Sequence, residues 1–128
     1  MSIDDIRSLL PQDRTDDARV KAIIALGYPT VVPIVPDLLK WLQDYNWPIA
    51  KAIAPFLVTI GVPLVPNLRD ILMTADDEWK FWIMTKIIAK SPEIAQGLQD
   101  ELERIATNPT ASERSSDLDN VAQEILHQ

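Results

Sequence analysis

A seven-residue segment occurs twice in the chain, with the second copy starting 30 residues after the first. The copies are Val32-Pro33-Ile34-Val35-Pro36-Asp37-Leu38 and Val62-Pro63-Leu64-Val65-Pro66-Asn67-Leu68, with five identities and two conservative changes. A first helical turn tolerates proline because its N–H groups have no intrahelical acceptor. Each copy is therefore predicted to open a helix of a repeated unit. The alternative is two unrelated helices that both begin with proline.

Apolar residues recur at helical spacing along most of the chain. Leu118, Val121, Ala122 and Ile125 follow the i, i+3, i+4, i+7 pattern of an amphipathic helix, and the alternation typical of strands is missing. We therefore predict an all-α protein of about eight helices. They are expected near residues 3–9, 15–26, 33–43, 47–60, 63–74, 77–90, 92–106 and 114–126.

Glycine and proline mark the expected helix ends. Gly27 and Gly61 each follow an apolar run, where a residue with positive φ is needed to end a helix. Ser91 is a suitable N-cap for a helix that starts at Pro92. Pro55 stands inside a predicted helix, where it removes a hydrogen bond, so we expect that helix to bend.

Each copy of the repeat is followed by a polar turn and a second apolar helix. Residues 32–60 and 62–90 are thus predicted to form two superimposable helical hairpins. Such hairpins cannot bury their apolar faces alone and stack into a short α-solenoid. A chain of 128 residues can bury a sizeable core, so we predict a single domain over residues 1–128.

The formal net charge is −7, from 12 basic and 19 acidic side chains. Residues 93–128 hold two basic and eight acidic side chains, which gives −6 for this part. Nucleic acid is an unfavourable partner, because affinity for phosphates depends on clustered lysine and arginine. The acidic region is either an ordinary solvated face or a surface that meets a basic protein.

Several kinds of chemistry lack the residues they require. The chain has no cysteine and three glycines, and its one histidine, His127, is the penultimate residue. These features disfavour thiolate sites, phosphate loops and histidine-activated nucleophiles. We predict no catalytic residue and no cofactor. Residues 76–78 suggest helix capping, and together with Asp44 they have a metal site or paired-carboxylate catalysis as weaker alternatives.

Trp47 is the most informative of the four tryptophans. Trp41, Trp79 and Trp82 fall at helical positions and are expected to pack in the core. Trp47 lies in a turn, where a large ring either packs the next helix against its neighbour or projects as a binding anchor. The candidate interaction surface consists of Asp44, Tyr45, Asn46, Trp47, Asp76 and Asp77.

Neither a targeting signal nor a membrane span is expected. Asp4 and Asp5 stand where a secretory signal needs basic residues. The longest apolar run, residues 49–60, is interrupted by Lys51 and is shorter than the ~20 residues that cross a bilayer. We expect a cytoplasmic protein with no membrane partner.

Four segments carry a resemblance to a known family. They are Leu9-Leu10-Pro11-x-Asp13, Trp41-Leu42-Gln43-Asp44-x-Asn46-Trp47-Pro48-x-Ala50, Trp79-Lys80-x-Trp82 and Glu101-Leu102-x-Arg104-Ile105-Ala106-x-Asn108-Pro109-Thr110. The chain resembles a bacterial family of uncharacterised domains over nearly its whole length. The resemblance implies a fold similar to HEAT repeats and implies no activity.

A non-catalytic protein-interaction module is the function that these observations favour. The partner is expected to be a protein or peptide, held on the surface formed by the second helix of each hairpin, near residues 48–60 and 78–90. The main alternative is an immunity or antitoxin-like inhibitor whose acidic surface covers a basic toxin. A HEAT-like DNA glycosylase is disfavoured, since it requires a basic concave face.

Overall fold

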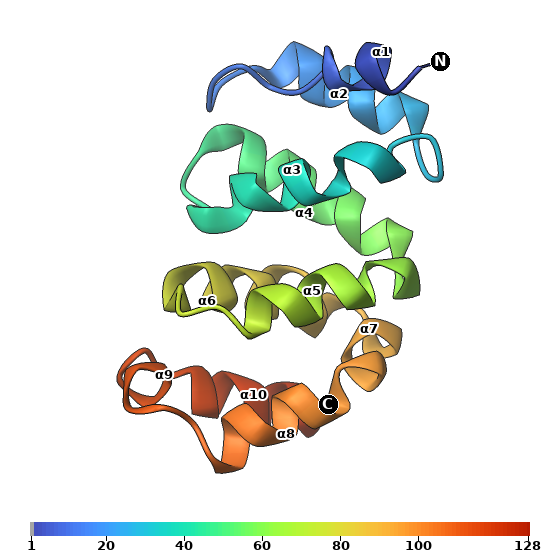
Figure 1. Ribbon diagram of the computed structural model, residues 1–128. Coiled ribbons are helices and arrows are strands. Elements are labelled where there is room, and N and C mark those ends of the chain that lie inside the picture. The colour runs from blue at the N-terminus through green and yellow to red at the C-terminus, as the bar shows by residue number, and fades with distance from the viewer. Residues whose placement is uncertain (1) are drawn as a thin grey trace. The chain divides into compact units, whose positions relative to one another are not determined.

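The fold is described by a computed structural model of residues 2–128, in which every regular element is helical (Figure 1). The α-helices are α1 (Ile3–Arg7), α2 (Asp17–Leu26), α3 (Val35–Lys40), α4 (Pro48–Ile60), α5 (Val65–Leu72), α6 (Asp77–Lys86), α7 (Pro92–Gly97), α8 (Gln99–Thr107), α9 (Ala111–Ser115) and α10 (Leu118–Leu126). Four 3₁₀ turns accompany them: η1 (Val32–Ile34), η2 (Trp41–Gln43), η3 (Val62–Leu64) and η4 (Ile88–Lys90). The predicted all-α class is confirmed.

The chain divides into two compact units, Met1–Phe56 and Leu57–Gln128, which are described separately.

The first unit contains α1, α2, η1, α3, η2 and the first part of α4. Ser2 and Asp5 form a reciprocal capping box at the start of α1, and Asp16 caps α2. The backbone N–H of Ile49 donates to the carbonyl of Arg14 at 3.3 Å, which fixes the start of α4 to the segment before α2. The buried apolar side chains of this unit include Ile6, Val20, Ile23, Val31, Ile34, Leu38, Leu39, Leu42, Ile49 and Ile53.

The second unit contains the remaining elements, from the end of α4 to α10. Helices α8 and α10 lie side by side in its orange and red part, and α10 also contacts α6 (Figure 1). Their inner faces follow the apolar periodicity of the sequence. The buried side chains include Leu64, Leu68, Leu72, Ile83, Met84, Ile94, Leu98, Leu102, Ile105, Leu118, Ala122 and Ile125.

Both copies of the repeated segment fold in the same way. Each begins with a 3₁₀ turn, η1 or η3, and continues directly into an α-helix, α3 or α5. The first valine of each copy is exposed, at 48% for Val32 and 52% for Val62, whereas Ile34 and Leu64 are buried. The repeat is thus a repeat of local structure, as predicted. The stacking of two hairpins into a solenoid stays a prediction.

Eight helices is too low a number, because two predicted helices are each divided in the structure. The predicted helix 92–106 breaks at Leu98 into α7 and α8. Gly97, just before the break, lies so close to α5 that an added Cβ would stand 2.9 Å from Cγ2 of Val65. The predicted helix 114–126 begins earlier, as α9, and breaks at Asp117, whose φ of 65° is one that aspartate tolerates.

Helix α4 runs from Pro48 to Ile60 with Pro55 inside it. Pro55 is exposed and has no N–H to donate to the carbonyl of Lys51. The predicted bend at this position stays a prediction. Between residues 2 and 128, no single helix is long and apolar enough to cross a membrane. Taken together, Pro48–Ile60 and Val62–Leu72 reach that length and apolar character, but as a pair bent by 109°.

Gly27 and Gly61 have positive φ values, 69° and 78°, which confirms their predicted role at helix ends. An added Cβ at either position would meet no atom within 4 Å, so backbone strain is the sole steric penalty. We expect Gly27→Ala or Gly61→Ala to lower the free energy of unfolding by about 1–3 kcal/mol. Chemical denaturation measures this loss. D-alanine at the same position should restore stability, and equal losses with both enantiomers would contradict the strain explanation.

Candidate functional site

A groove of about 370 Å³ in the first unit contains two of the four tryptophans. Its lining residues are Leu10, Pro11, Asp37, Lys40, Trp41, Gln43 and Trp47. The rings of Trp41 and Trp47 lie 5.5 Å apart between centroids, edge to face at 72°, and both side chains are half-buried. Such a pair combines a large apolar surface with an indole N–H on each ring. We call this feature the aromatic groove.

The turn before α4 positions Trp47 in the aromatic groove. Oδ1 of Asp44 accepts a hydrogen bond from the backbone N–H of Asn46 at 2.9 Å. The carbonyl of Asp44 accepts from the N–H of Trp47 at 3.2 Å, and Pro48 then begins α4. Four of the predicted interaction residues, including the half-buried Tyr45, thus form one turn. Trp47 packs against Trp41 and also retains an accessible part, so its ring combines features of both predicted roles.

Two charged side chains accompany the rings. Lys40 is exposed and forms no ion pair with any residue between 2 and 128. Asp37 lies 3.8 Å from the guanidinium of Arg7, a long and solvent-exposed pairing. The aromatic groove therefore offers apolar surface together with one cation and one carboxylate.

The other two predicted interaction residues begin α6 in the second unit, and both have structural partners. The Oδ1 atom of Asp76 accepts from the backbone N–H of Trp79 at 3.0 Å, which confirms its interpretation as a helix cap. Asp77 accepts from the hydroxyl of Ser112 and pairs with the ammonium of Lys80 at 3.2 Å. Asp77 thus belongs to a charged cluster inside the second unit.

That charged cluster is centred on Glu113, whose side chain is fully buried. Arg104 donates to both carboxylate oxygens, from Nη1 to Oε1 at 2.9 Å and from Nη2 to Oε2 at 2.8 Å. Oε2 also accepts from the buried ammonium of Lys80 at 3.2 Å, and Oε1 accepts from the backbone N–H of Thr110 at 2.8 Å. The cluster borders a pocket of about 300 Å³ lined by Leu72, Met73, Thr74, Lys80, Glu101, Arg104, Thr110 and Glu113.

The electrostatics of the cluster follow from these hydrogen bonds. The two hydrogen bonds from Arg104, helped by Thr110 and Lys80, outweigh the effect of burial and lower the pKa of Glu113 from 4.5 to about 2. The same pairing raises the pKa of Arg104. Glu113 is therefore a carboxylate at neutral pH and is unsuited to donate a proton.

Lys80 and Glu113 have no role predicted from the sequence, although each carries a signal there. Thr110-x-x-Glu113 is a capping box, and the structure contains both of its hydrogen bonds. Lys80 lies three and four residues before the buried Ile83 and Met84, so it falls on the apolar face of α6. A lysine on such a face predicts a buried partner.

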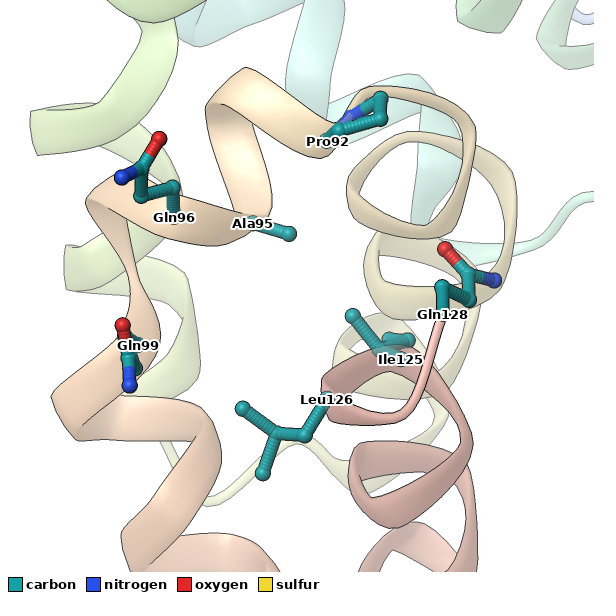
Figure 2. A pocket seen from close by; sticks show the side chains of 7 residues that line it. All are labelled: Pro92, Ala95, Gln96, Gln99, Ile125, Leu126 and Gln128. Carbon is teal, nitrogen blue, oxygen red and sulfur yellow. The ribbon is translucent and has the colours of Figure 1, made fainter.

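A third depression lies between α7, the start of α8 and the end of α10 (Figure 2). Its volume is about 320 Å³, and its lining residues are Pro92, Ala95, Gln96, Gln99, Ile125, Leu126 and Gln128. We call it the C-terminal groove. No lining side chain is ionisable. Within residues 2–128, no group of three or more Asp, Glu or His side chains is arranged to hold a metal ion.

The segments that carry the family resemblance converge on two of these sites. The first two segments contribute Leu10, Pro11, Trp41, Gln43 and Trp47 to the aromatic groove. The last two contribute Lys80, Glu101, Arg104 and Thr110 to the pocket beside the charged cluster. A family model described as Domain of unknown function (DUF5071) matches residues 9–126. No curated protein matches the chain.

We expect Glu113→Gln to lower the free energy of unfolding by about 3 kcal/mol, because it leaves the buried Lys80 and its neighbour Arg104 without their shared anion. Glu101→Gln is the matched control, since its pairing with Arg69 is partly exposed and contributes at most about 1 kcal/mol. Urea denaturation of both variants measures the difference. Equal losses would contradict a central role for Glu113.

The lowered pKa of Glu113 also predicts an acid-dependent loss of stability. Its carboxylate contributes fully at pH values above its ordinary pKa of 4.5, and the contribution disappears as the pH falls towards 2. The total is about 3 kcal/mol, of which about 2 kcal/mol is lost by pH 3. Denaturation at pH 6 and pH 3 should show that the difference in free energy of unfolding between wild type and Glu113→Gln decreases by that amount. A difference that does not change with pH would contradict the lowered pKa of Glu113.

Proposed function

The chain belongs to the family described as Domain of unknown function (DUF5071), and because that description assigns no activity, we propose a function from the geometry. The protein is a non-catalytic module that binds a protein or peptide partner in the aromatic groove. The observation that carries this proposal is the half-buried pair Trp41 and Trp47 in a groove of about 370 Å³.

Two features of the aromatic groove support binding of a polypeptide. Tryptophan is enriched among the residues that contribute most to binding at protein interfaces, because one ring supplies a large apolar contact and loses little conformational entropy. Lys40 and Asp37 at the same groove provide charges of both signs, which can orient a peptide without selecting a strongly charged one. The volume is at the lower end of the range for ligand pockets, as expected for a site that holds one or two side chains.

A HEAT-like arrangement forms part of this proposal. The repeated 3₁₀ turn and helix, η1–α3 and η3–α5, support two equivalent hairpins over residues 32–60 and 62–90. Stacked hairpins present an extended surface on which a polypeptide binds.

A second candidate function is inhibition of a basic protein, in the manner of an immunity protein or antitoxin. It is favoured by the charge of residues 93–128, which is −6. Four of the acidic side chains, Glu93, Asp100, Glu103 and Glu124, are exposed, and none forms an ion pair within residues 2–128. Such uncompensated charge accelerates association with a cationic partner.

We expect Trp47→Ala to weaken partner binding while the protein stays folded. Loss of a half-buried ring and of its contact with Trp41 should lower the free energy of unfolding by about 2 kcal/mol. The matched control is Trp79→Ala, which removes another half-buried tryptophan, from α6 rather than from the aromatic groove.

The measurement is affinity capture from the native host with wild type and both variants, followed by titration of the purified partner. Binding should be retained by Trp79→Ala and weakened at least about tenfold by Trp47→Ala. A partner that binds Trp47→Ala with unchanged affinity would refute the aromatic groove as its site.

A further inference from the structure

The C-terminal groove combines an apolar floor with amide groups. Ala95 on α7 and Leu126 near the end of α10 point into the space between the two helices (Figure 2). Pro92 and Ile125 add apolar surface, and three glutamines supply carboxamides. The side chains of the floor carry no charge that could repel or attract an ion.

Three acidic residues adjoin lining residues of this floor, one through a hydrogen bond and two as neighbours in the chain. Glu103 is bound directly to a lining residue, because its Oε1 accepts from Nε2 of Gln99 at 3.0 Å. Glu93 follows Pro92 in the chain, and Glu124 precedes Ile125. All three glutamates are exposed and form no ion pair within the described part of the chain.

Nearby cations do not neutralise these carboxylates. Arg104, on the same helix as Glu103, has both of its terminal nitrogens on Glu113. Lys90 is exposed and lies two residues before Pro92. Three exposed glutamates thus stand against this one exposed lysine.

We propose that the C-terminal groove binds an arginine or lysine side chain from an exposed basic segment of a partner protein. The long apolar stem of such a side chain packs on the floor, and its charged head reaches the surrounding carboxylates. An aliphatic or aromatic side chain would use the floor alone and leave the three glutamates unmatched. This inference rests on the second candidate function and specifies its site.

The test begins with a hexa-arginine peptide titrated into the full chain by calorimetry at low ionic strength. A hexa-citrulline peptide of the same shape and no charge should not bind. Ala95→Leu fills the groove without changing the charge and should weaken arginine peptide binding at least about tenfold. If Ala95→Leu does not fold, Gln128→Trp fills the groove from the exposed end of the chain.

Two triple variants distinguish binding at the groove from attraction to the overall negative charge of the protein. Glu93→Gln, Glu103→Gln and Glu124→Gln combined should weaken binding at least about tenfold. The matched control combines Asp4→Asn, Asp70→Asn and Glu78→Gln, three exposed acidic residues outside the groove with the same change in net charge. The control should bind nearly as well as wild type.

Four results would overturn the proposal. If both triple variants weaken binding equally, the peptide responds to overall charge and not to the groove. If Ala95→Leu binds the arginine peptide with unchanged affinity, the peptide binds elsewhere. If sedimentation shows that the wild type is a dimer and that Ala95→Leu is a monomer, the groove is occupied by a second copy of the chain. If a basic protein binds wild type and Ala95→Leu with equal affinity, the second candidate function still holds, but the C-terminal groove is not its site.

Discussion

The buried carboxylate of Glu113 is the interaction on which much of the second unit depends. It joins α9, which carries Glu113, to α8 through Arg104 and to α6 through Lys80. Helix α9 has five residues, too few to be stable alone in water, so its place depends on these contacts. A buried charge is costly to desolvate, and the bidentate guanidinium, the ammonium and the N–H of Thr110 together offset that cost.

The three depressions offer different chemistry. The aromatic groove presents two tryptophan rings with one charge of each sign, whereas the pocket beside Glu113 has charges that are matched internally. The C-terminal groove is lined by uncharged side chains, and one of them, Gln99, donates to the exposed Glu103. These differences favour recognition of polypeptide side chains in the first and third sites and a mainly structural role for the second.

Local signals predicted much of the fold and part of the candidate site. Gly27 and Gly61 have the positive φ expected of them, and Asp76 caps α6 as its position suggested. The turn around Trp47 was also identified, because its residues are close in sequence. Asp77 was predicted to share a surface with that turn, but its partner Ser112 is 35 positions away and no local pattern indicates it.

The sequence by itself determined the helical class, the caps and the repeated turn, since each follows from interactions within about one helical turn. Tertiary structure decided which polar groups are buried and where long apolar patterns break. Lys80 and Glu113 are 33 residues apart, and helix periodicity does not specify such a contact. The same limit applies to the end of α7, where Gly97 is needed because Val65 of another helix approaches its backbone.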